Sequence, residues 1–209
     1  MKQEDSGYEP TAELLARMPG ISGNAVNGLG EEQESPPRPF FWHPPDRQTH
    51  GELQQYIVGQ LRPPAGEDRS FRNPAVDRGP DPIAQSAERI ERSAGEWSEA
   101  IKSFALDDEA DLVGLTPLRP EYVFEGYQVT EPNLVMVGVA HDFERLAQAP
   151  GSTENPAAYH DLHDQYNRAA RVAGRLVNFI RGQGYAATAY PGPMADAINM
   201  IPPAIACLL

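Results

Sequence analysis

The spacing of apolar residues predicts two long helices in the second half of the chain. From Asp81 to about Phe104, apolar side chains recur every three or four residues, which is typical of a helix with one buried face. Asp81-Pro82 is typical of an N-cap followed by a first-turn proline. The same pairing at Asn155-Pro156 begins a second predicted helix. It ends at Gly182-Gln183-Gly184, where a glycine can adopt the left-handed conformation that terminates helices.

Two hydrophobic runs predict strands that are buried on both faces. They are DLVGL at 111–115 and NLVMVGVA at 133–140. YAATAY at 185–190 predicts a third strand, and IPPA at 201–204 predicts the start of a further helix. Strands buried on both faces need helices above and below their sheet. We therefore expect residues 81–209 to form an α+β domain with helices packed on a mostly central sheet.

Residues 1–80 are interpreted as an acidic, proline-rich arm. Eleven prolines fall in this stretch, and proline removes backbone donors and interrupts helices. Short helical patterns remain at 11–18 and 51–61, and the apolar triplet Phe40-Phe41-Trp42 lies between prolines. Two interpretations stay open. The first is an irregular arm that packs on the main domain, and the second is a disordered arm that binds a partner.

Composition narrows the classes of partner. The 209 residues carry 30 acidic and 17 basic side chains, a net charge of −13. Nucleic-acid binding rests mainly on Lys and Arg that neutralise phosphates, so we expect no nucleic-acid partner, and an anionic membrane surface is disfavoured for the same reason. The first residues lack the apolar core of a secretory signal, and no apolar run approaches the ~18 residues of a membrane span. We therefore expect a cytoplasmic protein.

Histidines beside acidic residues are candidates for chemistry. His160 and His163, in the sequence YHDLHDQY, are spaced to share one helical face and could ligate a metal together. A zinc site needs a further protein ligand, and the alternative is a solvated helix face, so we predict no metal site. His141-Asp142 directly follows the strand at 133–140, at a strand end where α/β proteins tend to place their sites. The alternative there is a polar end to the strand.

The chain has one cysteine, Cys207. A single cysteine forms no disulfide within the chain and cannot ligate an iron–sulfur cluster on its own. The neighbouring residues contain no basic or glycine-rich segment that would activate the thiol.

Four segments of the second half share a characteristic order of motifs. They are ADLVGLTPLRPEYVF at 110–124, PNLVMVGVAHDFE at 132–144, RVAGRLVNFIRGQGYAATAY at 171–190 and IPPAIA at 201–206. This order resembles the corrinoid-binding half of the cobalamin-dependent reductive dehalogenases and of the related epoxyqueuosine reductases. The resemblance covers about half of the chain.

The resemblance implies a flavin-reductase-like cobalamin-binding domain with cobalamin as its cofactor. In the family, the Pro-x-Ala segment continues into Gly-Leu-Gly-Glu and later into two cysteine-rich [4Fe-4S] motifs. Here the sequence reads Ala206-Cys207-Leu208-Leu209 and ends. We therefore expect an incomplete domain, truncated before the iron–sulfur region. The implied partner is a missing C-terminal half or a separate iron–sulfur protein.

The resemblance also implies site residues. A proton donor near the corrinoid is implied between the Gly-Tyr-x-Ala strand and the Pro-x-Ala helix, with Tyr190 as the first candidate and Asp196 as the second. Tyr190 lies beside a proline–glycine loop, and the alternative for it is a tyrosine packed on the sheet edge. Contacts to cobalamin are implied for Tyr185, Pro202 and Ala204.

Two functional hypotheses follow. In the first, the chain is a fragment resembling a reductive dehalogenase, an oxidoreductase that cleaves carbon–halogen bonds, and it is inactive alone. In the alternative, it is a non-catalytic binding or scaffold module that pairs with a separate iron–sulfur polypeptide.

Overall fold

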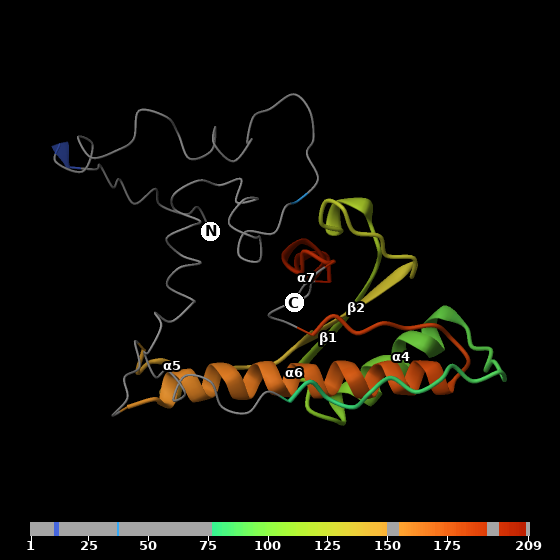
Figure 1. The fold of residues 1–209 in the computed structure, drawn as a ribbon, viewed down its shortest axis with the longest axis horizontal. Coiled ribbons are helices and arrows are strands. Elements are labelled where there is room, and N and C mark those ends of the chain that lie inside the picture. Colours follow the sequence, from blue (N-terminus) through green and yellow to red (C-terminus); the bar gives the residue numbers. More distant parts are fainter. Residues whose placement is uncertain (1–10, 13–36, 38–76, 150–154, 192–196, 208–209) are drawn as a thin grey trace, which may run out of the picture. The chain divides into compact units, whose positions relative to one another are not determined.

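The computed structural model describes residues 11–12, 37, 77–149, 155–191 and 197–207 (Figure 1). The chain divides into two compact units, Met1–Ser35 and Pro36–Leu209, and every element below belongs to the second. Several predictions lie outside the described residues: most of the helix at 11–18, the helix at 51–61, the triplet Phe40-Phe41-Trp42 and the candidate Asp196. The division into an arm and a domain at residue 80 stays a prediction.

The second unit is an α+β arrangement of helices and a small antiparallel sheet. In chain order the elements are α4 (Ala94–Leu106), β1 (Leu112–Pro117), the 3-10 turn η3 (Pro120–Tyr122), β2 (Asn133–Gly138), α5 (Phe143–Leu146), α6 (Ala157–Gly182) and α7 (Ile201–Ala206). The strands predicted at 111–115 and 133–140 are confirmed. The helix end at Gly182 and the helix beginning at Ile201 are confirmed as well.

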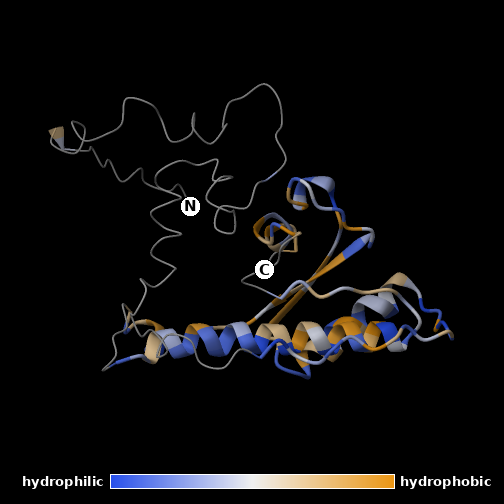
Figure 2. Cartoon of the chain, viewed as in Figure 1, coloured by the Kyte–Doolittle hydropathy of each residue, from blue (hydrophilic) through white to orange (hydrophobic). Residues whose placement is uncertain are grey.

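The two strands pair antiparallel, with Leu112 opposite Gly138 and Pro117 opposite Asn133. Both α4 and α6 pack against them, and Figure 2 shows hydrophobic residues in the strands and in the neighbouring part of α6. The buried residues at this junction are Ala105, Ala110 and Val172, with Val113 and Val137 packed against them. Small side chains at the contact let the helices approach the sheet closely.

A second cluster joins the segment before α7 to the connection between the strands. Val123 and Ile198 form an isolated β-bridge, and the Phe124 backbone N–H donates to the Ala197 carbonyl at 2.9 Å. The buried members of this cluster are Tyr122, Leu134, Ala197 and Ile198. These contacts position α7 against both strands.

The helix predicted with Asp81 as its N-cap begins twelve residues later than expected, at Ala94. Its N-cap is Ser93 rather than Asp81. The Ser93 side chain accepts from the Glu96 backbone N–H, and the Glu96 side chain accepts from the Ser93 backbone N–H, which together form a capping box. The structure shows no helix over residues 77–93.

The segment over residues 77–92 runs beside α6 instead (Figure 1). The Ile83 N–H donates to Asn178 Oδ1 at 2.8 Å. Further along, Ser86 N donates to the Arg181 carbonyl at 2.9 Å and Ile90 N to the Gln183 carbonyl at 3.0 Å. These backbone N–H groups therefore donate to acceptors on α6 and at its C-terminal end, and they do not require hydrogen bonds within a helix formed by the segment itself.

Three further expectations are wrong. Residues 185–190 form no strand. Their polar groups are bound by side chains, since Arg181 Nε donates to the Ala187 carbonyl at 2.9 Å. In β2 only Leu134 is buried, and in β1 the two buried residues, Gly114 and Thr116, share one face, so neither strand is buried on both faces. The first residue of α6 follows Pro156, and no side chain caps it, so Asn155 is not the N-cap.

Among the described residues, no helix is both long and apolar enough to cross a lipid bilayer.

Candidate functional site

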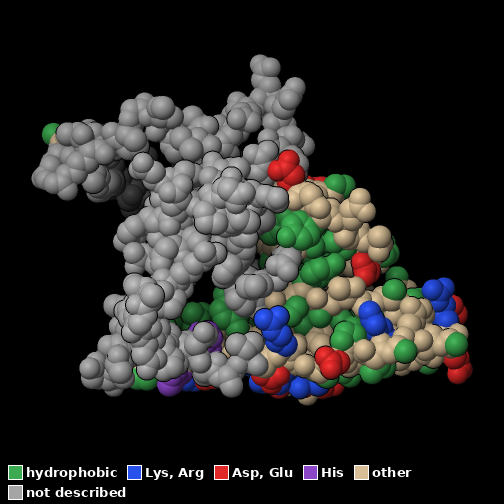
Figure 3. Space-filling model, viewed as in Figure 1, with side chains coloured by type: hydrophobic (Ala, Val, Ile, Leu, Met, Phe, Trp, Pro, Cys, Tyr) green, Lys and Arg blue, Asp and Glu red, His purple; other side chains and the backbone are tan. Residues whose placement is uncertain are grey.

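The candidate site is a mainly apolar cleft of about 760 Å³. Its walls come from α4, both strands, the C-terminal half of α6 and the segment over residues 185–191. Figure 3 shows hydrophobic side chains at the surface between α6 and α7. A volume of this size falls within the range of roughly 300–1,000 Å³ that is usual for small-molecule sites.

Tyr190 brings a hydroxyl group to this cleft. The side chain is half-buried and packs against the Tyr122 and Leu134 cluster, and it also lines the cleft. Burial, and to a smaller extent the Glu131 carboxylate, raises the pKa of Tyr190 above its ordinary value of 10.0. The hydroxyl is therefore protonated at neutral pH and able to donate.

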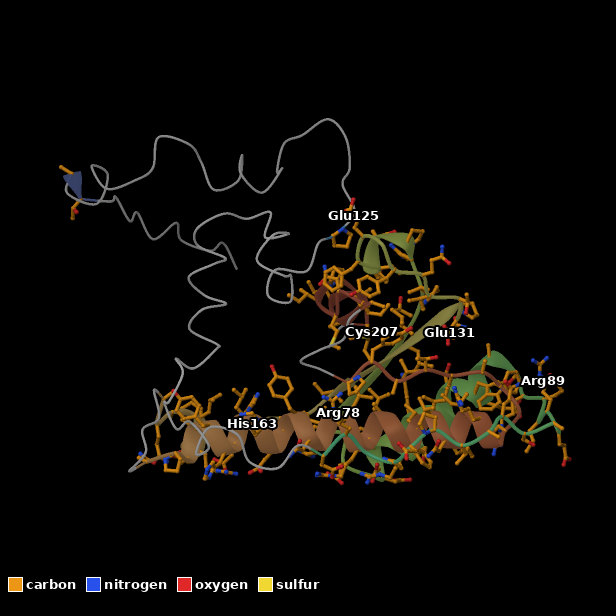
Figure 4. The ribbon with its side chains drawn as sticks, viewed as in Figure 1. Arg78, Arg89, Glu125, Glu131, His163 and Cys207 are labelled. Carbon is orange, nitrogen blue, oxygen red and sulfur yellow. The ribbon has the colours of Figure 1, made fainter. Side chains whose placement is uncertain are left out.

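Glu131 and Thr188 place a negative charge on the cleft wall. Thr188 Oγ1 donates to Glu131 Oε1 at 2.6 Å, and both residues line the cleft. This hydrogen bond is the main reason that the pKa of Glu131 lies below its ordinary value of 4.5. Figure 4 shows Glu131 near the beginning of β2.

Aromatic rings and guanidinium groups alternate at another part of the wall. Trp97 and Tyr185 meet edge to face, with ring centroids 5.0 Å apart. Arg92 lies 4.6 Å from the Trp97 ring centroid, and Arg89 lies 4.6 Å from that of Tyr185. Trp97, Tyr185 and Arg92 line the cleft, whereas Arg89 stands outside it, where Figure 4 labels it.

The structure brings two of the five implied site residues together. Tyr185 and Tyr190 both line the cleft. Pro202 and Ala204 are half-buried on α7 and do not belong to the described wall of the cleft. Asp196 lies outside the described residues. The roles implied for all five stay predictions.

Several polar or aromatic residues of the cleft carry no functional signal in the sequence, and four of them are Arg92, Trp97, Glu131 and Thr188. They come from three segments that only tertiary structure brings together. In the sequence, Trp97 is one more apolar position of a helix, and the other three have no motif around them. The sequence Ser93-x-x-Glu96 is typical of a capping box at the N-terminus of a helix, and this pattern indicates that Arg92 lies just before a helix.

A separate polar cluster lies at the other end of α6. His141 Nδ1 and Asp161 Oδ2 are 2.7 Å apart. Asp161 Oδ1 accepts from Gln165 Nε2 at 3.1 Å and from the Asp142 backbone N–H at 3.2 Å. Burial works to raise the pKa of Asp161, but the hydrogen bonds, that of His141 first, outweigh it and hold the pKa below its ordinary value. The cluster ties the turn after β2 to α6, which supports the interpretation of His141-Asp142 as a polar end to the strand.

The remaining candidates from the sequence are His160, His163 and Cys207. Within the described residues, no group of three or more His, Cys, Asp or Glu side chains is placed to hold a metal ion, and His160 and His163 belong to no such group. Cys207 follows α7 and is half-buried. Burial raises the pKa of its thiol, against a smaller opposite effect of Lys102, so the thiol is not activated at neutral pH.

No protein-family model and no curated protein sequence matches this chain.

Proposed function

We propose that the chain supplies the ligand-binding part of a reductive-dehalogenase-like oxidoreductase and is inactive alone. The observation that carries the proposal is the Tyr190 hydroxyl, a protonated group bordering an apolar cleft of about 760 Å³. The motif order in the sequence supports the family, and the α+β arrangement is compatible with a flavin-reductase-like domain. A cytoplasmic location belongs to the same proposal.

The proposed role of Tyr190 is that of a proton donor. Reductive dehalogenation replaces a carbon–halogen bond by a carbon–hydrogen bond, consuming two electrons and one proton and releasing a halide ion. An apolar cleft suits the apolar body of a halogenated organic compound, because burying that body removes apolar surface from water. A phenol is protonated at neutral pH even at its ordinary pKa, so Tyr190 has a proton to donate. What supports the role is the position of Tyr190 in the wall of the cleft.

The apolar character of the cleft supports contact with one face of a corrinoid. Its apolar walls suit the flat ring of cobalamin, and Asn133 offers a polar group to the amides at the ring edge. Cobalamin is larger than the drug-sized ligands that clefts of this volume enclose, so a bound corrinoid would extend beyond these walls. When bound, the cofactor would supply the low-valent cobalt chemistry that breaks the carbon–halogen bond.

Electrons for this chemistry would come from a partner. The 209 residues contain one cysteine, which is too few to ligate an iron–sulfur cluster. We therefore include a separate iron–sulfur protein in the proposal as the electron source. A non-catalytic scaffold module remains the alternative, and the position of the Tyr190 side chain in the wall of an apolar cleft supports the first hypothesis.

The test is co-elution of hydroxocobalamin with the purified chain in gel filtration, detected by the corrin absorbance. We expect co-elution for the wild type and its loss in Ala173→Phe, because Ala173 lines the cleft and a phenyl ring would fill it. The matched control is Ala157→Phe on the same helix, which lies outside the described cleft wall. Near-ultraviolet circular dichroism checks that each variant is folded, and Ala169→Phe, also in the wall, replaces Ala173→Phe if that variant is not.

Absence of co-elution from the wild type would contradict the proposal. Equal co-elution of a folded Ala173→Phe variant would also contradict it, since the corrinoid would then bind elsewhere.

A further inference from the structure

We infer that the ligand of the cleft carries an anionic group on an apolar body, and that Arg92 binds this group. The inference deepens the proposed function and rests on it in one respect, namely that the cleft is a ligand site. Carboxylates and sulfonates are the chemical classes that a guanidinium recognises in this way.

Arg92 is a half-buried cation at the cleft whose hydrogen-bonding capacity is mostly unused. Within the part of the chain that the structure describes, its guanidinium donates one hydrogen bond, from NH1 to Gln183 Oε1 at 2.8 Å, and makes no ion pair. A guanidinium carries five N–H donors. The Glu96 carboxylate accepts from the backbone and the side chain of Ser93, and the charge of Arg92 contributes to lowering its pKa without an ion pair between the two side chains.

Three of the four arginines of α6 pair with carboxylates, whereas half-buried Arg181 makes no ion pair within the described residues and donates instead to the carbonyls of Ile83 and Ala187. Arg171 pairs with Asp77 and Glu109, and Arg175 pairs with Asp108 and Glu109. Arg168 pairs with Asp111 at 3.0 Å. Arg181 satisfies its guanidinium with two backbone carbonyls, but Arg92 makes one hydrogen bond, to a neutral amide. The contrast points to a further acceptor for Arg92 that comes from outside the chain.

The surroundings of Arg92 fix its guanidinium in place. The group lies over the Trp97 ring, 4.6 Å from the centroid, and Trp97 in turn contacts Tyr185. Stacking on an aromatic face and a hydrogen bond to Gln183 hold the planar group in one orientation. A fixed guanidinium loses little conformational entropy when it binds an oxyanion.

The charge on Glu131 sets the orientation of such a ligand. Arg92 is bound to Gln183 at the start of the segment 183–190, whereas Glu131 is bound to Thr188 near its end. An anionic group is attracted by Arg92 and repelled by Glu131. The apolar end of the ligand therefore extends toward Glu131 and Tyr190, where the proposed proton donor lies.

The test compares two fluorescent probes with the same aromatic body. 1-Anilinonaphthalene-8-sulfonate carries a sulfonate, and N-phenyl-1-naphthylamine lacks it. For Arg92→Gln we expect sulfonate binding at least tenfold weaker than in the wild type and binding of the neutral probe within twofold. The matched control is Arg89→Gln, because Arg89 also stacks on an aromatic ring but stands outside the cleft; it should leave both probes unchanged.

Circular dichroism in the near ultraviolet checks folding, since a molten state also binds the sulfonate probe. If Arg92→Gln is not folded, Arg92→Lys replaces it. That variant keeps the charge but loses the planar fork, and sulfonate affinity should be lower than in the wild type. Unchanged sulfonate affinity in the folded variant, or equal weakening of both probes, would overturn the inference.

The outcomes separate the two proposals. Arg92-dependent sulfonate binding without hydroxocobalamin co-elution leaves the inference standing and removes the proposed function. Hydroxocobalamin co-elution with sulfonate binding that is independent of Arg92 does the reverse.

Discussion

His141 Nδ1 lies 2.7 Å from Oδ2 of Asp161, a side chain with no exposed surface. The two residues belong to different elements, the turn after β2 and the first half of α6. Arg145 of α5 lies near the same carboxylate, at 3.8 Å from Oδ1. One buried carboxylate therefore connects β2, α5 and α6.

Replacing Asp161 by Asn should destabilise the fold. Asparagine is nearly the same size as aspartate, but an NH₂ group replaces one of the two carboxylate oxygens. That NH₂ group cannot accept a hydrogen bond from the donors around Asp161. Hydrogen bonds to buried charged groups contribute about 1.5–3 kcal/mol, and we expect a loss of that size in the free energy of unfolding, measured by urea denaturation. Asp164→Asn is the control, because Asp164 is half exposed and its ion pair with Arg145 is worth at most about 1 kcal/mol. Equal losses in the two variants would contradict the assignment.

The Glu109 carboxylate should make stability depend on pH in acid. Hydrogen bonds from Arg171, and then from Arg175, lower the pKa of Glu109 from 4.5 to about 2. A depressed folded-state pKa means that the contribution is complete above the unfolded value of 4.5 and is lost as the pH falls toward 2. Glu109→Gln should therefore be less stable than the wild type by about 1–2 kcal/mol at neutral pH, and the difference should shrink on acidification. Denaturation at a series of pH values measures this, with exposed Glu99→Gln as control. A difference that stays constant between pH 6 and about 3 would refute the assignment.

Ser93 and Asp81 provide a direct comparison of two helix-start predictions. Ser93→Ala should cost about 1 kcal/mol of stability, because it removes the capping box of α4. Asp81→Ala should be nearly neutral, since the hydrogen bond that Asp81 makes to Asn178 Nδ2 uses its backbone carbonyl. Thermal denaturation of both variants checks this. A larger loss for Asp81→Ala would show that the helix begins where the sequence pattern placed it.

Two glycines at the end of α6 should respond oppositely to alanine. Gly184 has φ +88°, and an added Cβ would overlap the Glu88 carbonyl oxygen. Gly184→Ala should therefore lose at least about 1–2 kcal/mol from the left-handed conformation alone. Gly182 has open space around it, so Gly182→Ala should be neutral or gain up to about 1 kcal/mol from helix propensity. Urea denaturation measures both, and a neutral Gly184→Ala would contradict the described contact with residues 88–89.

Local patterns predicted the elements whose signals are local. The apolar runs of β1 and β2, the periodicity of α6 and the glycine at its end all appear in the structure. The helix predicted at 81–93 failed because α6 supplies hydrogen bonds that a sequence pattern does not show. Ile83 and Ile90, which helped to suggest a helix, are 46% and 39% exposed, so their spacing does not mark a buried face.

The candidate site was predictable only in part. The family resemblance predicts Tyr185 and Tyr190 as site residues, and both side chains line the cleft. The strand expected over residues 185–190 is absent, because polar groups of this segment form hydrogen bonds with side chains rather than with a neighbouring strand. Glu131 lies 57 residues from Thr188, and no local pattern in the sequence connects two positions so far apart.

We propose that the cleft binds the corrinoid, and the fluorescence of Trp97 reports on this binding. Trp97 lines the cleft, and the only other tryptophan of the sequence is Trp42, so Trp42→Phe leaves a single reporter. Titration with hydroxocobalamin should quench the fluorescence of Trp97 in a saturable manner. Ala173→Phe in the same background should abolish the saturable phase, and Ala157→Phe should preserve it. Quenching that never saturates, or that survives in a folded Ala173→Phe variant, would contradict the account.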